Sequence, residues 1–467
     1  MTRQNLPGLA CKAGHDPRAA ALRAIHAVLR GDENSQSALS RGLDSGEMSP
    51  TDRRLCTELA YGVLRAYGSL RDEVFALLDN PDKLPPEMRL TLILSCYELG
   101  RLRVPPHATV HWAVTHIRNR FGRDLAGVAN AVLRSLARRR GAGEDPPPPS
   151  GSPLPPGAGD EEALARRHAL PSWIVRLWRE QYGQEALLRY LAASSGRPPS
   201  GLRLNRRFPD WVDTLRGLQA QGPPEARPLR VGEAALAFPG SLPVQAGRLL
   251  AEGRASRQSA ASYQALLSLE PSSWPGPLWD ACAGRGGKTM ALLEVGLPVA
   301  LATDPAGRRL RALAPEYRRL VPAPPLPRLL PLAAQEAPGG AAAPGGSSAS
   351  LPSRFGAVLL DVPCSGLGTL ARHPEIRLRL TAERISRLAA LQRALLEAAW
   401  DRLLPGGRVI YLTCTLNKAE NEDQIAAFLS RHASATLIRE FQTPSDSPLL
   451  EFFYAACLGR SDAATGG

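Results

Sequence analysis

From residue 278 onwards, segments typical of buried strands alternate with segments typical of helices. The predicted strands are 278–281, 299–303, 328–332, 357–361 and 408–413. The predicted helices are 288–295, 306–320, 382–403 and 419–432. This alternation predicts a doubly wound, mainly parallel α/β sheet with helices on both faces. Ligands of such sheets bind at the carboxyl ends of the strands, so residues that directly follow a strand are the candidates for function.

The chain before this region divides into three parts. Residues 16–140 carry apolar residues at helical spacing, for example Leu55, Leu59 and Val63, and predict an all-helical bundle of five to seven helices. Residues 141–161 are rich in Pro and Gly and predict a linker. Residues 162–250 predict a small α+β unit, with helices at 173–181 and 184–194 and a strand at 201–205. The sheet domain then spans 251–460, with a surface loop predicted at 337–353.

The net charge of the chain indicates what kind of partner it binds, and its cysteines indicate the cellular compartment in which it works. The 467 residues carry a net charge of +13 with a pI of 9.9, which favours a polyanion such as RNA; a genome-wide bias towards Arg is the alternative. The seven cysteines are dispersed and form no C-x-x-C pair, so we expect no zinc site and no disulfide framework. Residues 1–20 lack an apolar signal region, and no apolar run is long enough to span a bilayer. We therefore expect a cytoplasmic protein.

A glycine-rich turn follows the first predicted strand. Residues 280–289 read DACAGRGGKT, in which the glycines allow close backbone approach and the following helix favours an anionic group. A phosphate-loop motif would need glycine where Cys282 stands, so that interpretation fails. Asp304 ends the next strand and is placed either to bind a ribose diol or to cap the helix after Pro305. The incomplete glycine pattern favours an adenosyl cofactor over a dinucleotide.

Two cysteines follow two further strands at the same predicted edge. Cys364 lies in the sequence Asp361-Val362-Pro363-Cys364, and Cys414 follows the strand 408–413. A free cysteine is most often a small buried hydrophobe, but two in loops at one sheet edge indicate a thiol pair with a chemical role. We expect the acidic run at 417–422, which reads NKAENE, to cap the helix that it opens.

These motifs resemble those of the RNA cytosine-C5 methyltransferases of the NOL1/NOP2/Sun family. Residues 361–366 with 369–376 resemble the fourth motif of the family, Thr413 to Thr415 with 420–422 the sixth, and 280–289 the glycine-rich first motif. The helical N-terminal region is similar to the NusB-like RNA-binding domain found in bacterial members. The resemblance covers nearly the whole chain. It implies a Rossmann-like class I methyltransferase domain, preceded by an all-α NusB-like domain and a small α+β RNA-binding subdomain.

The resemblance also implies residue roles. Cys414 would attack C6 of a cytosine in 16S ribosomal RNA as a thiolate, so that C5 accepts the methyl group of S-adenosylmethionine. Cys364 would assist loss of the C5 proton and release of the enzyme, and Asp361 would contact the base or the cofactor. The target base must leave its stack to be reached. We expect a monomer. The residues implied in cofactor binding are Cys282, Ala283, Gly284, Arg285, Gly286, Gly287, Lys288, Asp304 and Asp361.

The sequence departs from the family pattern at several positions. Gly284-Arg285 replaces the usual Ala-Pro of the first motif, and residues 333–336 lack the Asp that contacts adenine, which Gln335 or Glu336 could replace. Residues 449–454 resemble the last strand without its usual Gly-Asp-Gly lead. Two alternatives stay open: a methyltransferase acting on transfer RNA, and a non-catalytic RNA-binding assembly factor. The NusB-like region disfavours the first, and the two intact cysteines disfavour the second.

Overall fold

The computed structural model describes residues 16–31, 33–43, 48–141, 161–320, 327–336 and 352–461. The chain forms two compact units. Unit 1 comprises residues 1–180, 190–196 and 370–379, and unit 2 comprises 181–189, 197–369 and 380–467. The predicted linker at 141–161 and the predicted loop at 337–353 fall largely outside the described residues. Among the described residues, no helix combines the length and the apolarity needed to cross a bilayer.

Unit 1 is helical, as predicted. Its helices are α1 (Pro17–Leu29), α2 (Ser35–Leu43), α3 (Pro50–Arg65), α4 (Tyr67–Phe75), α5 (Pro86–Arg101), α6 (Pro106–Phe121), α7 (Arg123–Gly141), α8 (Glu161–His168) and parts of α9 (Ser172–Ser195), with a 3₁₀ turn η1 at Pro81–Lys83. At the start of α3 the Ser49 side chain accepts a hydrogen bond from Asp52 N, and Pro50 occupies the first helical position, where its missing N–H costs nothing. Leu59, Leu92 and Leu133 lie in one core, so the apolar stripes pack together.

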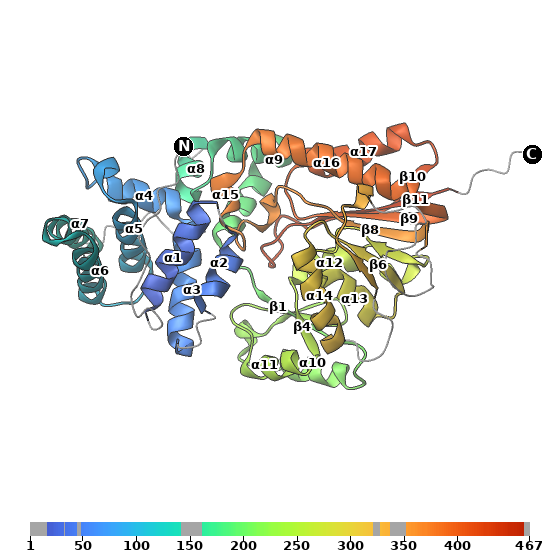
Figure 1. Cartoon of the computed structure of the whole chain (residues 1–467), viewed down its shortest axis with the longest axis horizontal. Helices are drawn as coiled ribbons and strands as arrows, with labels where there is room; N and C mark the ends of the chain where they lie inside the picture. Colours follow the sequence, from blue (N-terminus) through green and yellow to red (C-terminus); the bar gives the residue numbers. More distant parts are fainter. Residues whose placement is uncertain are drawn as a thin grey trace, which may run out of the picture. The chain divides into compact units, whose positions relative to one another are not determined.

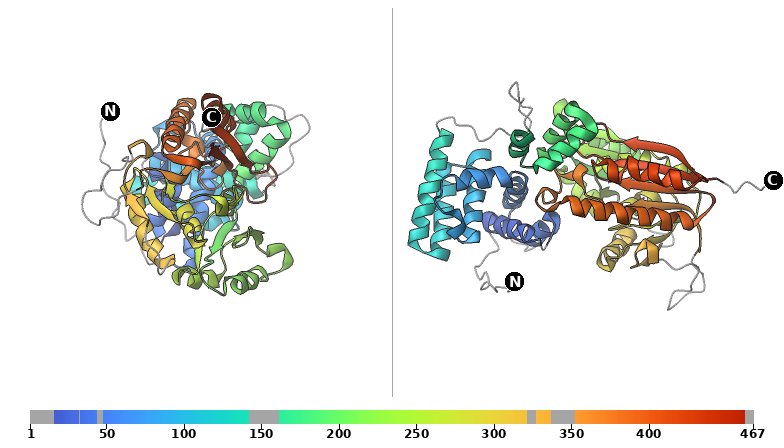
Figure 2. Two further views of the ribbon diagram at one scale, coloured as in Figure 1. Left: turned by 90° about the vertical axis from the view of Figure 1, so that its right-hand side faces the viewer. Right: turned by 90° about the horizontal axis from the view of Figure 1, so that it is seen from above.

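Two helical features follow directly from the sequence. Helices α6 and α7 lie side by side, joined at Gly122, whose φ of +93° a residue with a side chain rarely adopts (Figure 2). Helix α9 changes direction at Gly183, which has φ +80°. The backbone at Gly183 is not helical, so the range Ser172–Ser195 contains two helical segments, in agreement with the two helices predicted on either side of this position.

A short segment from late in the sequence belongs to unit 1. Residues 370–379 end in helix α15 (Ile376–Arg379), and the buried Arg377 guanidinium donates hydrogen bonds to the carbonyl oxygens of Arg65 (2.7 Å), His168 (3.1 Å) and Ser194 (2.7 Å). Burial lowers the pKa of Arg377 to about 9. One arginine thus ties α3, α8 and α9 to this segment.

Unit 2 contains the predicted small α+β subdomain. Its four strands, β1 (Ser200–Leu204), β2 (Leu229–Val231), β3 (Ala235–Phe238) and β4 (Ala255–Arg257), form an antiparallel sheet in the order β2-β3-β1-β4. Helices α10 (Trp211–Gln219) and α11 (Val244–Ala251) contribute Leu215, Leu218 and Ala246 to its core. A 3₁₀ turn η2 (Pro224–Ala226) precedes β2.

The larger sheet of unit 2 has seven strands in the order β10-β11-β9-β8-β5-β6-β7. The strands β5 (Leu278–Asp280), β6 (Val299–Thr303), β7 (Arg328–Leu330), β8 (Phe355–Asp361) and β9 (Leu403–Thr413) are parallel, as predicted. The strand β11 (Tyr454–Arg460) pairs antiparallel with β9, and the edge strand β10 (Ala435–Gln442) pairs antiparallel with β11. The fold is therefore the mainly parallel, Rossmann-like sheet that the alternation predicted.

Helices cover both faces of this sheet (Figure 1). One face carries α12 (Ala260–Leu267), α13 (Gly287–Glu294) and α14 (Gly307–Leu320), and the other carries α16 (Ala382–Asp401) and α17 (Glu422–Arg431). Alternate residues of one strand enter different cores: Leu359 packs with the first helix group, and Val358 and Leu360 pack with the second. Because successive side chains of a strand point to opposite faces of the sheet, both faces of β8 are buried.

Two details of the predicted elements were wrong. Residues 449–453 are not a strand, because β11 begins at Tyr454. The helix predicted from 419 begins at Glu422, because residues 418–420 form a separate 3₁₀ turn, η6 (Lys418–Glu420). Both differences lie in backbone that bends around buried polar contacts, which a hydrophobic pattern does not reveal. The remaining 3₁₀ turns are η3 (Pro271–Ser273), η4 (Ala334–Glu336) and η5 (Leu367–Thr369).

Candidate active site

The two predicted cysteines meet at the edge of the sheet. Strands β8 and β9 are parallel neighbours with Asp361 beside Leu412, so both following loops leave the sheet at the same edge. The Sγ atoms of Cys364 and Cys414 lie 3.3 Å apart, and the backbone N of Cys414 lies 3.3 Å from Cys364 Sγ. Both side chains are partly exposed, so a ligand can reach the sulfur pair.

The two sulfurs are not equivalent. The hydrogen bond to Cys414 Sγ, together with burial, holds the pKa of Cys364 well above its usual range. Cys364 is therefore a thiol at neutral pH, and its Sγ accepts a hydrogen bond from the backbone N–H of Cys414; either sulfur can be the donor in the contact between the two side chains.

Gly368 brings a third chain segment to the cysteine loops. Its N–H donates to the carbonyl oxygen of Cys414 (3.0 Å), and its own carbonyl oxygen accepts from the N–H of Phe452 (2.9 Å). A Cβ at this position would lie 2.1 Å from the Phe452 oxygen and 2.9 Å from the Cys414 oxygen. Only glycine fits between the two segments without moving one of them.

The glycine turn lies at the carboxyl end of β5, as predicted. Gly284 and Gly286 have φ values of +56° and +82°, and a Cβ on Gly286 would lie 2.7 Å from Leu313. Asp304 accepts a hydrogen bond from Gly284 N (3.1 Å) through one carboxylate oxygen and from Ala306 N (2.8 Å) through the other. The structure therefore brings Asp304 to the turn, where it also makes the short-range cap contact that was the alternative.

Lys288 links the glycine turn to the segment that carries Cys364. Its ammonium group lies 2.6 Å from a carboxylate oxygen of Asp361. The Lys288 side chain is largely buried, whereas Asp361 keeps 37% of its side chain exposed. A partly exposed carboxylate next to a fixed ammonium can still accept hydrogen bonds from a ligand on its open side. The predicted site residues therefore lie together at the carboxyl ends of neighbouring strands: Lys288 in the first turn of α13, Asp361 at the end of β8, and Cys364 and Cys414 in the loops after β8 and β9.

Three other predicted residues make weaker contributions to the geometry. Burial, with the nearby carboxylates Asp280, Asp361 and Asp304, raises the pKa of Cys282 well above its usual value, so this cysteine stays a thiol. Arg285 is exposed and Ala283 is buried. Within the described ranges, no group of three or more His, Cys, Asp or Glu residues is arranged to hold a metal ion.

The chain was compared with known proteins. The model of the 16S rRNA methyltransferase RsmB/F family matches residues 265–449, that of the NusB family matches 15–138, and that of the Methyltr_RsmF/B-like ferredoxin-like domain matches 170–245. Ribosomal RNA small subunit methyltransferase B of Vibrio cholerae serotype O1 is 32% identical over 431 residues, which cover 90% of this chain and 91% of that protein. The chain belongs to the 16S rRNA methyltransferase RsmB/F family.

Further comparisons agree with this family. The probable ribosomal RNA small subunit methyltransferase B of Synechocystis sp. is 32% identical over 423 residues, which cover 87% of each chain. The solved structure titled Crystal Structure of PH0851 superposes with a TM-score of 0.72 over 98% of this chain and 100% of that one, at 21% identity, which shows the shared fold. The predicted resemblance and its three-part architecture are thereby confirmed: NusB-like helical domain, small ferredoxin-like subdomain and Rossmann-like methyltransferase domain.

S-adenosylmethionine is the cofactor that membership of the RsmB/F family entails, and the glycine turn fits it. The Oδ1 atom of the buried Asp280 has no hydrogen-bond partner among the described residues. Gly284 has open space where a Cβ would stand. Burial raises the pKa of Asp280 to about 7. An unpartnered carboxylate oxygen beneath an open turn suits a ligand that carries an ammonium group and hydroxyl donors.

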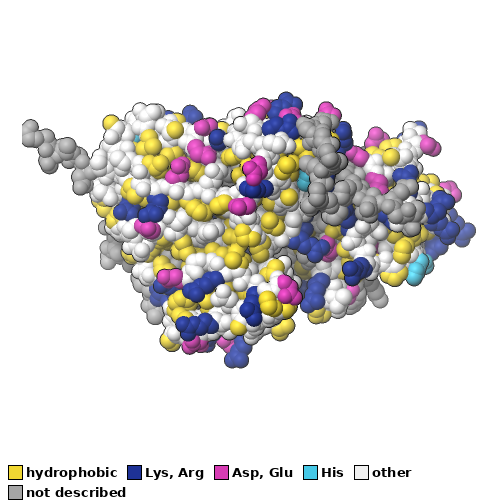
Figure 3. All heavy atoms as spheres, turned by 180° about the vertical axis from the view of Figure 1, so that it is seen from behind, with side chains coloured by type: hydrophobic (Ala, Val, Ile, Leu, Met, Phe, Trp, Pro, Cys, Tyr) yellow, Lys and Arg dark blue, Asp and Glu magenta, His cyan; other side chains and the backbone are white. Residues whose placement is uncertain are grey.

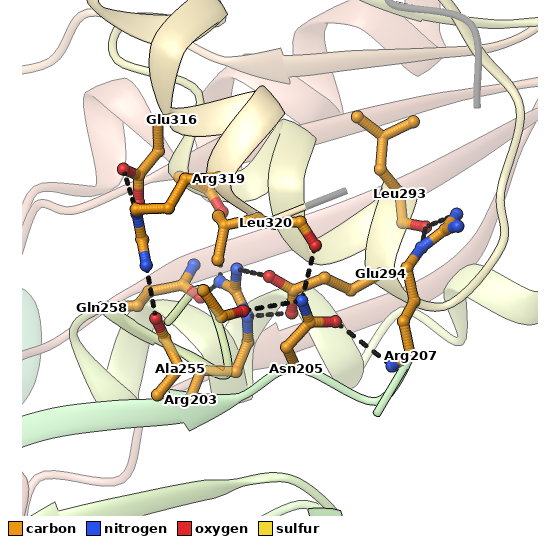
Figure 4. Close-up of polar contacts among 12 residues, drawn as sticks. Arg203, Asn205, Arg207, Ala255, Gln258, Leu293, Glu294, Glu316, Arg319 and Leu320 are labelled. Atoms are coloured by element: carbon orange, nitrogen blue, oxygen red, sulfur yellow. Dashed lines mark hydrogen bonds and ion pairs between the residues drawn. The ribbon is translucent and has the colours of Figure 1, made fainter. Parts of the chain in front are cut away.

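Sequence reasoning missed a polar network that supports the turn (Figure 4). The Arg203 guanidinium of β1 donates to both carboxylate oxygens of Glu294 (2.7 Å each) and to the carbonyl oxygen of Gly287 (3.2 Å), and also contacts Gln258. Gly287 and Glu294 are the first and last residues of α13. Both side chains of the ion pair are 2% exposed. One arginine of the ferredoxin-like subdomain therefore holds both ends of the helix that follows the glycine turn.

Asn205 and Arg319 extend this network (Figure 4). Asn205 donates to the carbonyl oxygens of Gly253 (2.9 Å) and Leu320 (2.6 Å), and Arg319 contacts the carbonyl oxygens of Leu250 and Ala255. The sequence did contain a signal for this network. Arg203 and Asn205 are two positions apart, so they lie on the same face of β1 and its extension, and both are buried.

Proposed function

We propose that the protein methylates C5 of a cytosine in 16S ribosomal RNA, with Cys414 as the nucleophile. The observation that carries this proposal is the 3.3 Å separation of the Cys364 and Cys414 sulfurs at the edge of the sheet that also bears the glycine turn. A pair of thiols is not needed for methyl transfer to an oxygen or nitrogen atom, which is already nucleophilic. One nucleophilic thiol is needed when a ring carbon must first be activated by addition at its neighbour, and a second thiol beside it can assist release of the enzyme.

Each site residue has a defined task in this reaction. The Cys414 thiolate adds to C6, and the electron pair of the C5–C6 bond makes C5 nucleophilic. S-adenosylmethionine supplies the methyl group that C5 receives. Cys364 assists loss of the C5 proton, which finally leaves to water. The electrons of the C5–H bond then restore the double bond, the S–C6 bond breaks, and its electron pair returns to Cys414.

The residues around the sulfurs bind and orient the base and the cofactor. Asp361, held by Lys288, contacts the base edge or the cofactor through its exposed side. The turn from Cys282 to Lys288 and the carboxylates of Asp280 and Asp304 hold the cofactor. On the face drawn in Figure 3, lysine and arginine side chains lie in separate groups with acidic side chains among them. The net charge of +13 favours contacts with the phosphates of a large RNA.

The direct test uses S-adenosylmethionine labelled in its methyl group and small-subunit RNA that lacks modification. The wild-type protein is expected to label this RNA on C5 of one cytosine, located by nuclease digestion and mass spectrometry. Cys414→Ala is expected to remove activity, because the sulfur that adds to C6 is lost. Cys457→Ala, which changes a buried cysteine in the middle of β11, is the matched control and keeps activity.

Cys364→Ala tests the release step separately. The S–C6 adduct is expected to accumulate, because addition proceeds while proton loss and elimination slow down. It appears as a protein band of reduced mobility on a denaturing gel, and it requires RNA and Cys414. Labelling of transfer RNA in place of 16S RNA would overturn the substrate, and full activity of Cys414→Ala would overturn the nucleophile.

A further inference from the structure

A buried carboxylate lies behind the two cysteine loops. The Glu420 side chain is fully buried and accepts four close hydrogen bonds. Its Oε1 accepts from Ser365 N (2.8 Å) and Gln392 Nε2 (3.0 Å). Its Oε2 accepts from Ser365 Oγ (2.5 Å) and Asn417 Nδ2 (3.1 Å). Of the acidic run expected to cap the next helix, Glu422 lies in the first turn of α17, whereas the Glu420 carboxylate faces the cysteine loops instead.

The donors come from both cysteine loops. Ser365 directly follows Cys364, and Thr415 directly follows Cys414. The hydroxyl oxygens of Ser365 and Thr415 lie 2.5 Å apart, and Thr415 Oγ1 also lies 3.5 Å from Glu420 Oε2. One carboxylate thus fastens the residue after each sulfur.

Further contacts fix the carboxylate itself. The Tyr411 hydroxyl donates to the Glu420 carbonyl oxygen (2.7 Å), which anchors its backbone to β9. Gln392 of α16 donates both to Glu420 and to the carbonyl oxygen of Pro363 (2.9 Å), the residue before Cys364. The Cys364 loop is therefore held on both sides of its sulfur.

The chemical cost of this arrangement indicates a role beyond packing. Within the described part of the chain, no lysine or arginine forms an ion pair with Glu420, so neutral donors alone offset the loss of its hydration. Burying a carboxylate in this way is unfavourable unless every lone pair is used. Two apolar side chains would join these elements more simply, but they would not fix the loops in one geometry.

We propose that Glu420 is a positioning residue that holds the Cys364 and Cys414 sulfurs together for methyl transfer. It touches neither the cytosine nor the cofactor and acts through Ser365 and Thr415. This inference rests on the function proposed above. Glutamine cannot replace it, because each carboxylate oxygen receives an N–H donor, from Ser365 on one side and Asn417 on the other. The amide NH₂ of glutamine would face one of these donors.

Glu420→Gln is the decisive variant, and Glu422→Gln is its matched control. Glu422 lies two residues further on, in the first turn of α17, and its Oε2 has no hydrogen-bond partner among the described residues. We expect kcat of Glu420→Gln to fall about 100-fold, the effect of a misplacement of about 1 Å. The KM for S-adenosylmethionine is expected to stay unchanged, since the glycine turn is not altered. A general loss of structure would instead change both constants.

A second measurement follows the sulfurs without RNA or methyl transfer. Phenylarsine oxide captures two adjacent thiols: two As–S bonds form, the As=O bond breaks, and one water leaves. The wild-type protein is expected to bind one equivalent at this pair, and the single variant Cys364→Ser shows the background from the other cysteines. Glu420→Gln is expected to bind the arsenical at least about 10-fold more weakly, because chelation needs both thiols in one geometry.

The two measurements separate the two proposals. If the wild-type protein binds the arsenical at the pair but methylates no RNA, the proposed function fails while the positioning role is still decided by the arsenical. Unchanged kcat, or unchanged arsenical binding, in a folded Glu420→Gln protein overturns the positioning role. If that variant does not fold, Ser365→Ala serves instead: it removes one donor to the carboxylate without exposing a charge. It is expected to lower kcat and arsenical affinity together, and unchanged values for both overturn the proposal.

Discussion

Replacing Gly368 with alanine tests whether the cysteine geometry depends on close packing of three chain segments. Gly368 lies in η5 and bonds to the Cys414 backbone on one side and to Phe452 on the other. The added Cβ would lie 2.1 Å from the Phe452 oxygen, whereas ordinary contacts begin at 3.4 Å. Both neighbours are backbone atoms, so no side chain can rotate away to relieve the contact.

The size of the expected loss of kcat follows from the difference between this distance and an ordinary contact distance. The segments must separate by about 1 Å, and the segment bonded to Cys414 carries the nucleophile. A displacement of this size lowers kcat about 100-fold, equivalent to about 2.7 kcal/mol in the activation free energy. The assay is transfer of a labelled methyl group to 16S RNA under saturating cofactor, with kcat measured separately from KM. Thermal unfolding is expected to shift far less than kcat, because the affected bonds lie in loops.

Gly217→Ala is the control for this substitution. Gly217 lies in α10, where a Cβ meets nothing within 4 Å. Alanine is favoured over glycine inside a helix by about 1 kcal/mol, so this variant is expected to be at least as stable as the wild-type protein and equally active. If Gly368→Ala folds and retains the wild-type kcat, the reasoning from contact distances is refuted.

Three further substitutions address stability. Arg203→Ala leaves the buried Glu294 carboxylate without its partner and is expected to destabilise unit 2 by about 3–5 kcal/mol in urea unfolding; a loss below about 1 kcal/mol would contradict the contribution of the ion pair. Arg377→Met removes the donors of several buried carbonyl groups and is expected to destabilise unit 1 by about 3 kcal/mol, measured by hydrogen exchange in α3 and α8. The folded-state pKa of Asp280 is about 7 against a usual value of 3.8, so the folded protein holds this proton more tightly. The free energy of unfolding is therefore expected to fall between pH 4 and 7 by up to about 4 kcal/mol and then to level off. Asp280→Asn is expected to flatten this part of the dependence of unfolding free energy on pH. An unchanged dependence in this variant would refute the raised pKa of Asp280.

The sheet and its functional edge could be predicted because their signals are local. Each parallel strand is a short apolar run followed directly by a polar or glycine-rich turn. Strand β6 agrees with its predicted range of 299–303, and β8 and β9 extend theirs only towards the N-terminus. Parallel strands present their carboxyl ends at one edge, so placing Cys364 and Cys414 after two strands already implied that they lie close together. In the structure the Sγ atoms of the two cysteines lie 3.3 Å apart, as this argument predicts.

The supporting contacts could not be predicted because they join residues far apart in sequence. Arg203 and Glu294 are separated by 91 positions, and Ser365 and Glu420 by 55. Arginine and glutamate are charged and do not contribute to a hydrophobic pattern. From residue type alone, each would be expected on the surface. Glu420 has an acidic neighbour in Glu422 and precedes a helix, so the local pattern favoured a cap. Only the three-dimensional arrangement distinguishes a capping carboxylate from a buried acceptor.

The strands bring the two cysteine loops to one edge, but they do not determine the distance between the sulfurs. Register fixes Asp361 beside Leu412, and each sulfur lies beyond the last paired residue of its strand. The remaining distance depends on the Glu420 carboxylate behind the loops and on Gly368 between them. These contacts stabilise one arrangement of loops rather than the whole fold. Variants at Glu420 and Gly368 are therefore expected to lose kcat while keeping most of their stability, whereas variants at Arg203 lose stability first.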